Sequence, residues 1–84
     1  MKITFKLFAS LTDYLPPEAR TSNIVSLEVP AQASISDIIA PFGMPEKLVH
    51  LVLVNGVYIP PAERAGRGLN DGDQLAIWPP IAGG

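Results

Sequence analysis

The residues best suited to chemistry in this chain are its last six, Pro-Pro-Ile-Ala-Gly-Gly. Pro79 and Pro80 each fix a φ angle and favour an extended chain, which over six residues reaches at most about 20 Å. Gly83 and Gly84 have no Cβ, so they form a tip thin enough for a narrow channel in another protein. A frayed terminus is the simplest alternative, but it does not explain why two prolines precede the glycines. We therefore predict that the carboxylate of Gly84 is a reactive group, presented to a second protein together with Gly83.

No other part of the sequence has an arrangement typical of a catalytic or metal site. The chain has no cysteine, which excludes disulfides, thiolate metal sites and a thiol nucleophile. His50 is the single histidine, and it cannot form a zinc site alone. Asp71 and Asp73 flank a glycine, a pattern typical of a tight turn in which aspartate accepts backbone hydrogen bonds. We expect no metal ion, no bound cofactor and no enzymatic activity of the chain by itself.

Charge and hydropathy restrict the class of protein further. The net charge of −2 comes without any run of like charge, so the basic footprint of a nucleic-acid-binding protein is missing. The longest apolar run, residues 48–54, is far too short to cross a bilayer. Hydrophobic residues make up 48% of the chain, enough for one modest core. These features predict one small cytoplasmic domain that binds neither nucleic acid nor a membrane.

Regular alternation of apolar and polar residues predicts two half-buried strands in the first half of the chain. In residues 2–8 and 24–29 the odd-numbered positions are apolar, and most even-numbered positions are polar. Phe8 is an exception, because it puts an aromatic ring on the polar side. Between the two strands, residues 9–15 are expected to form a short helical turn that Pro16 stops.

A short helix follows the second strand. Ser34 is a good N-cap, and Asp37 three positions later suits the positive end of the helix dipole. Apolar residues at positions 35, 38, 39 and 42 lie on one face of such a helix. Pro41 should limit it to about two turns, and Gly43 is a suitable C-terminal cap.

Three further strands complete the predicted elements. Residues 48–54, which include His50, are nearly all apolar, as in a strand covered on both faces or docked to a partner on one. Asn55-Gly56 then favours a type I′ hairpin turn, from which residues 57–59 return. Residues 74–78 form the last strand before the two prolines.

This order of elements predicts an α+β domain with the β-grasp, or ubiquitin-like, fold. A helix on one face of a mixed sheet of four to five strands satisfies the two-layer rule for a single core. The last strand must lie beside the first, in parallel, for the sheet to be one piece. We expect the folded domain to span residues 1–78 and residues 79–84 to form a flexible Gly-Gly tail.

Three stretches of the sequence resemble the MoaD/ThiS family of ubiquitin-like sulfur carriers. They are LFASL followed by DYLP (residues 7–16), VLVNG (52–56) and LNDGDQLAIWPPIAGG (69–84). The Asp-Gly-Asp turn at a fixed distance before Pro-Pro-x-Ala-Gly-Gly is the specific part, and this ending is nearer to the molybdopterin branch than to the thiamine branch. The short helix with Pro41 and the Gly-Met-Pro break after it depart from the family pattern.

The resemblance implies a function for the tail. An E1-like adenylating enzyme would use ATP and magnesium to adenylate the Gly84 carboxylate, and a sulfur donor would convert it to a thiocarboxylate. The tail would then enter a larger, MoaE-like synthase subunit and donate sulfur in molybdopterin biosynthesis. A thiocarboxylate suits this role because a chain without cysteine can carry sulfur only on its C-terminus. Together with the tail residues Pro79, Pro80, Ile81 and Ala82, the partner-binding candidates are Phe8, Leu51, Leu53 and Trp78, each of which could instead be core.

Other functions remain open at this stage. The carrier could serve thiamine synthesis or another pathway instead of molybdopterin. The chain could also be a ubiquitin-like modifier, conjugated to lysine side chains through Gly84, or a structural adaptor that never uses its tail.

Overall fold

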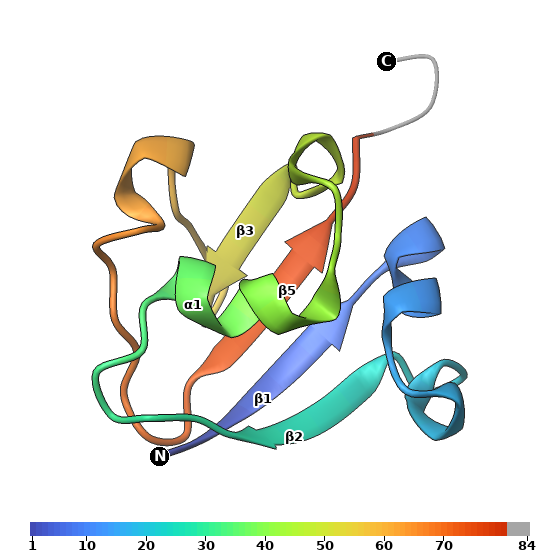
Figure 1. Ribbon diagram of the computed structural model, residues 1–84, viewed down its shortest axis with the longest axis horizontal. Coiled ribbons are helices and arrows are strands. Elements are labelled where there is room, and N and C mark those ends of the chain that lie inside the picture. Colours follow the sequence, from blue (N-terminus) through green and yellow to red (C-terminus); the bar gives the residue numbers. More distant parts are fainter. Residues whose placement is uncertain (81–84) are drawn as a thin grey trace.

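The strands lie in the order β2-β1-β5-β3-β4 in the computed structural model, which describes residues 1–80 (Figure 1). The bounds are Lys2–Leu7 for β1, Ile24–Glu28 for β2, Leu51–Val54 for β3, Val57–Tyr58 for β4, Gln74–Trp78 for β5 and Ile35–Ile39 for helix α1. β1 and β5 are parallel, and the other neighbouring strands are antiparallel. The predicted β-grasp arrangement, with the last strand beside the first, is therefore confirmed.

Short 3₁₀ turns make most of the connections between these elements. They comprise Ala9–Tyr14, Pro17–Ala19, Ala40–Phe42, Glu46–Leu48 and Pro61–Glu63. In the last four of these turns a proline lies at the first residue or next to it. Proline suits this place because its φ angle is already helical and its missing N–H has no partner in a first turn. The many prolines thus divide the chain into short elements.

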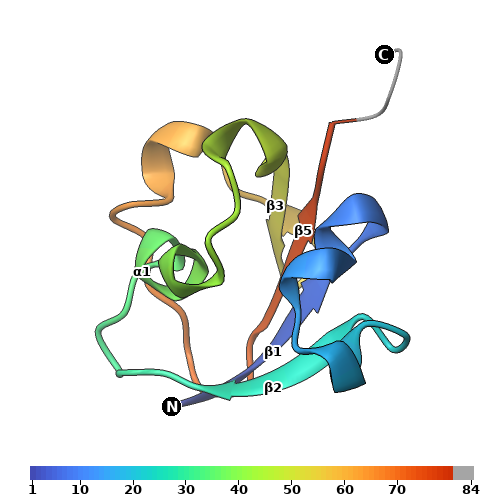
Figure 2. The same cartoon turned by 45° about the vertical axis from the view of Figure 1, so that its right-hand side comes forward.

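The core lies between the sheet and α1, which stands to one side of the sheet in Figure 2. It contains the alternate, inward-facing residues of β1 and β5, together with Ile35 and Ile38 of the helix. Phe5 is completely buried, and its ring stacks on that of Phe42 with the centroids 4.6 Å apart. Leu11 and Leu15, from the segment after β1, are also buried. The alternation in residues 2–8 therefore predicted the inner face of β1 correctly.

Helix α1 begins where its sequence predicts but is shorter than the predicted two turns, because it ends at Ile39. The Ser34 hydroxyl accepts a hydrogen bond from the Asp37 N–H, and the Asp37 carboxylate accepts one from the Ser34 N–H, both at 3.1 Å. This capping box satisfies two N–H groups that the first turn leaves free. At Pro41 the α-helix has already given way to a 3₁₀ turn, and Gly43 ends it in the left-handed region with φ of +70°.

The third strand begins three residues later than the sequence predicts. Residues 46–48 form a 3₁₀ turn after Pro45, closed by a hydrogen bond from the Val49 N–H to the Glu46 carbonyl. His50 therefore precedes β3 and is exposed, whereas we expected it inside the strand. An apolar run has no periodicity that separates strand from turn, and the proline before it decided the outcome.

Arg64 holds this segment in place. Its Nε donates to the Ile59 carbonyl at 3.0 Å, and its two Nη atoms donate to the carbonyls of Val49 and His50 at 3.1 and 3.0 Å. Only 8% of Arg64 is exposed. The side chain thus ties the chain entering β3 to the chain leaving β4. No motif in the sequence around Arg64 predicts this role.

We expect Arg64→Met to lower the free energy of unfolding by about 2–4 kcal/mol, because three carbonyls would lose a charged donor. Urea denaturation measures this change. Arg67→Met is the matched control, since Arg67 is exposed, and it should change the same free energy by less than about 0.5 kcal/mol. Equal effects of the two substitutions would contradict the assigned role.

The predicted hairpin turn at Asn55-Gly56 is confirmed, with positive φ angles of 50° and 83°. The Asn55 side chain accepts a hydrogen bond from the Gln74 N–H and donates one to the Asp73 carboxylate, both at 2.9 Å. The second carboxylate oxygen of Asp73 accepts the Asn70 N–H at 2.8 Å. The pKa of Asp73 is held below its ordinary value. The causes, largest first, are the hydrogen bond from the Asn70 main chain, the hydrogen bond from the Asn55 side chain and the positive charge of Arg67.

This shift sets the direction of a pH dependence. Because the pKa of Asp73 is lower in the folded state, its carboxylate contributes to the free energy of unfolding. This contribution is complete when the pH is above the unfolded-state pKa of about 3.9, and it is lost as the pH falls through the folded-state pKa. We expect Asp73→Asn to cost about 1 kcal/mol at pH 7, a small amount because the group is near the surface. In thermal unfolding, the difference between wild type and variant should shrink below about pH 4. A difference that stays constant down to pH 2 would contradict this account.

Candidate functional site

The sheet face opposite α1 has an apolar area at one end, which we call the outer-face patch. It consists of Phe8, Leu51, Leu53, Tyr58, Ala76 and Trp78. Leu51 and Trp78 are each 39% exposed, and Tyr58 is 47% exposed. Phe8, Leu53 and Ala76 are half-buried. Contiguous exposed apolar residues of this kind are typical of binding surfaces.

Strand register brings the members of the patch together. Leu51 of β3 lies directly opposite Trp78 of β5. One step further along the strands, Leu53 lies between Ala76 on one side and Tyr58 on the other. Residues directly opposite each other in neighbouring strands point to the same face, with their Cβ atoms about 5 Å apart. The patch is therefore a continuous surface across three strands.

The Phe8 ring extends the patch onto the chain after β1. It stacks on the Trp78 ring with centroids 3.9 Å apart and an interplanar angle of 2°. The next residue, Ala9, has a positive φ of 53°, which is uncommon for a residue with a Cβ. After this turn the chain returns to the core at Leu11. Phe8 keeps the outward position that alternation gives it, and its stacking on Trp78 accounts for an aromatic ring on the polar side of the strand.

The chain leaves the sheet beside this patch. The Trp78 carbonyl accepts a hydrogen bond from the His50 N–H at 3.2 Å, and β5 ends there. Pro79 is half-buried and Pro80 is exposed. The other predicted tail residues, Ile81, Ala82, Gly83 and Gly84, lie outside the described residues. The site as described is thus an apolar surface at the point where β5 continues into the tail sequence.

The structure brings together four of the partner-binding residues predicted from the sequence. Phe8, Leu51, Leu53 and Trp78 all belong to the outer-face patch, and none belongs to the buried core. Sequence reasoning missed Tyr58 and Ala76. The two-residue turn at Asn55-Gly56 fixes the hairpin register, so it could have placed Tyr58 opposite Leu53.

Polar residues surround the patch. Lys6 lies opposite Ala76 on the β1 side, and Thr4 lies opposite Gln74. The carboxylates of Asp71 and Asp73 accept main-chain hydrogen bonds in the turn before β5. Within residues 1–80, no three histidine, cysteine or acidic side chains gather as a metal ion would require. In the same residues, no helix has the length and apolarity needed to cross a membrane.

Comparison with known proteins identifies the family. The model of the Mut7-C ubiquitin family matches residues 1–82. The chain belongs to the Mut7-C ubiquitin family. No curated protein sequence matches it. Family membership agrees with the ubiquitin-like fold predicted from the strand order.

Several solved structures share the fold of this Mut7-C ubiquitin domain. SAMP1 from Haloferax volcanii is 25% identical with a TM-score of 0.67, and the alignment covers 100% of both chains. A Pyrococcus furiosus protein described as molybdopterin converting factor subunit 1 is 21% identical with a TM-score of 0.69, covering 96% of this chain and 99% of that one. Subunit 1 of the molybdopterin-converting factor from Helicobacter pylori was solved in a complex with subunit 2. That structure matches at 18% identity and a TM-score of 0.62 over 100% of each chain.

Two leucines on opposite faces of the sheet test whether the patch is surface or core. The Leu75 side chain of β5 is completely buried, so we expect Leu75→Ala to lower the free energy of unfolding by about 2–5 kcal/mol. Leu51→Ala in the outer-face patch should cost less than about 1 kcal/mol, because the side chain is already partly in water. Chemical denaturation of both variants decides, and similar losses would show that the patch is part of the core.

Proposed function

We propose that this Mut7-C ubiquitin domain is a sulfur carrier whose Gly84 carboxylate is adenylated and converted to a thiocarboxylate. The single observation that carries the proposal is that β5 ends in the outer-face patch, at Trp78. A partner that covers this patch would therefore meet the chain where the Pro79-Pro80 segment leaves the sheet. The resemblance of the tail sequence to sulfur carriers supports the same function.

The chemistry needs two steps that activating and donor enzymes supply. In the first, a Gly84 carboxylate oxygen attacks the α-phosphorus of ATP, held with magnesium by an E1-like enzyme, and pyrophosphate leaves. In the second, hydrosulfide released by the sulfur donor attacks the carbonyl carbon, and AMP and a proton leave, which gives the thiocarboxylate. Adenylation is required because a free carboxylate is a poor electrophile. The domain itself contributes a folded surface that the enzymes recognise and a C-terminal Gly-Gly segment, without side chains, that serves as the substrate.

We propose a larger synthase subunit, of the MoaE type, as the acceptor in molybdopterin biosynthesis. The complex of subunits 1 and 2 in the Helicobacter pylori structure supports a partner of this kind, because its subunit 1 has the same fold. The outer-face patch would contact that subunit while the tail enters its active site. Sulfur donation in thiamine synthesis or another pathway is the nearest alternative.

A second candidate function is protein modification. The structural neighbour SAMP1 is described as a small archaeal modifier protein, at an identity of 25%. In that case the activated carbonyl carbon of Gly84 would be attacked by a lysine amine, with an isopeptide bond as the product. Both functions share the adenylated intermediate and differ in the nucleophile that follows.

Intact-mass analysis of the protein isolated from its native host separates these functions. It first establishes whether Gly84 carries the free carboxyl group in the mature protein, which the proposal requires. A carrier should show a fraction in which one oxygen is replaced by sulfur. Lysine-linked adducts would identify a modifier, and neither product after co-expression with an activating enzyme would contradict both.

Variants connect the tail and the patch to this activity. Deleting Gly84, or adding one residue after it, should abolish sulfur transfer while changing the free energy of unfolding by less than about 0.5 kcal/mol, because among residues 1–80 the buried core ends at Ile77. Leu53→Lys should weaken complex formation with the larger subunit, because it puts a charge in the apolar patch. Gln32→Lys, on the helix side of the sheet, is its control. Loss of thermal stability on deletion of Gly84 would argue against a reactive tail.

A further inference from the structure

Strand β2 forms one edge of the sheet, and its inner face is incompletely covered. Its only neighbour in the sheet order of the described residues is β1. The inward-facing side chains of Val25 and Leu27 are half-buried, whereas those of Ile3 and Phe5 on the adjacent strand are fully buried. Figure 1 shows β2 at the lower border of the sheet, and α1 lies over the strands beyond it. The helix layer therefore stops short of this edge.

The main chain of β2 has hydrogen-bonding groups directed away from the sheet. Met1 and Val29 exchange both main-chain hydrogen bonds, at 2.7 and 2.9 Å, and the Leu7 N–H donates to the Asn23 carbonyl at 3.1 Å. In an antiparallel ladder the bonded pairs alternate, so the odd-numbered residues of β2 bond to β1. The N–H and C=O groups of Ser26 and Glu28 consequently point toward the open edge. Such a row is a template for another strand.

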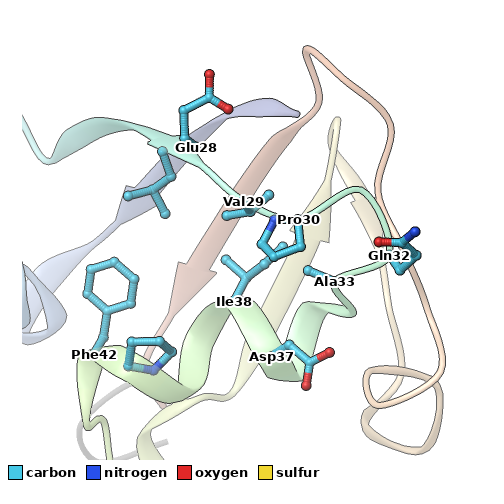
Figure 3. Close-up of a pocket in the computed structure, with 10 residues that line it drawn as sticks. Glu28, Val29, Pro30, Gln32, Ala33, Asp37, Ile38 and Phe42 are labelled. Atoms are coloured by element: carbon cyan, nitrogen blue, oxygen red, sulfur yellow. The ribbon is translucent and has the colours of Figure 1, made fainter.

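An apolar groove lies next to this edge, between β2 and α1 (Figure 3). It encloses about 540 Å³ and is lined by Leu27, Val29, Ala33, Ile38, Pro41 and Phe42 together with polar residues at its rim. Figure 3 shows Ile38 rising from the helix toward Val29 and Pro30. Pro41 and Phe42 belong to the 3₁₀ turn that follows α1, so the groove runs along both the helix and this turn. Its volume is in the usual range for a binding site, about 300–1,000 Å³.

The charged residues at the groove are acidic. Its lining residues include Glu28 and Asp37 but no lysine, arginine or histidine. Asp37 is engaged in the helix cap, whereas the Glu28 side chain is 73% exposed and points away from the groove, as Figure 3 shows. The Met1 amino group lies 3.7 Å from the Glu28 carboxylate, an exposed pair of the kind that contributes little. A basic residue opposite Glu28 would therefore be favourable.

We propose that β2 and this groove bind an extended segment of a partner protein, which adds to the sheet as a further strand. Its main chain would pair with Ser26 and Glu28. Alternate apolar side chains would enter the groove, because residues opposite Leu27 point to the helix side of the sheet. A lysine or arginine between them would lie beside Glu28 on the other side. Strand addition at a free edge with a pocket for alternate side chains is an established mode of peptide recognition.

This inference goes beyond the sulfur-carrier function and does not depend on it. The groove lies on the helix side of the sheet, and the outer-face patch lies on the opposite side. A partner bound to β2 would therefore leave the patch and the exit of β5 free. The domain could be held by one protein while its tail is used by another.

The experiment uses a capped peptide of about nine residues with alternating valine and lysine, a length typical of a strand and its flanks. The full chain, labelled with ¹⁵N, is titrated with the peptide, and amide chemical shifts are followed by NMR. We expect the largest shifts in residues 24–30 and 33–42. A second peptide of the same sequence, N-methylated at the amides that would face β2, should bind at least 10-fold more weakly because it cannot form the ladder.

Variants of the protein test the same contacts. Ser26→Pro removes an N–H that points to the open edge, so it should weaken peptide binding at least 10-fold without loss of a β1–β2 hydrogen bond. Glu28→Lys should weaken binding of the lysine peptide several-fold but not that of a valine–serine peptide. Tyr58→Lys, in the outer-face patch, is the control and should bind the peptide like wild type. Circular dichroism checks that each variant is folded, and the N-methylated peptide tests the idea on the unaltered protein.

Three results would overturn the proposal. Equal affinity for the N-methylated peptide would exclude strand pairing, and shifts confined to β4 or the outer-face patch would place the binding elsewhere. Shifts of the β2 amides that depend on protein concentration without peptide, with a doubled mass in sedimentation, would identify a second copy of this chain as the occupant.

Discussion

The parallel pairing of β1 with β5 is the constraint on which the rest of this structure depends. It joins the two ends of the sequence in the middle of the sheet, with Thr4 opposite Gln74 and Leu7 opposite Ile77. Parallel neighbours cannot be connected by a tight turn, so the intervening chain must cross from one end of the strands to the other. That crossing includes α1, which covers the inner faces of both strands. The completely buried residues of β1 and β5 are the result.

The same pairing creates the candidate functional site. Because β5 runs parallel to β1 and ends one register step beyond it, Trp78 comes beside Phe8 and the two rings stack. β3, on the other side of β5, adds Leu51 and Leu53 to the same face. The end of the last strand is therefore surrounded by apolar side chains on the face that the helix leaves open. A partner that binds this face would meet the start of the tail without any movement of the fold.

Much of the fold follows from local sequence signals with a direct physical cause. The alternation in β1 and β2, the Ser34 and Asp37 cap, and the turn at Asn55-Gly56 all act over a few residues, and each predicted its element correctly. The strand predicted over residues 48–54 is confirmed only from Leu51, because hydrophobicity alone does not distinguish the start of a strand from a turn that follows a proline. Arg64 was missed for a different reason. The three groups that accept its hydrogen bonds are main-chain carbonyls from 5 to 15 residues away, and no sequence pattern predicts them.

The sequence by itself determined the elements, their caps and turns, the absence of cysteine chemistry, and the tail sequence that resembles sulfur carriers. These properties depend on residue type and short spacing. In the nearly all-apolar strand β3, only the tertiary structure decided which residues are core and which are surface. Leu51 and Val52 are adjacent and chemically similar, yet one faces water and the other is fully buried. Which face a strand buries depends on which side the helix covers, and that is settled by contacts between residues far apart in the chain.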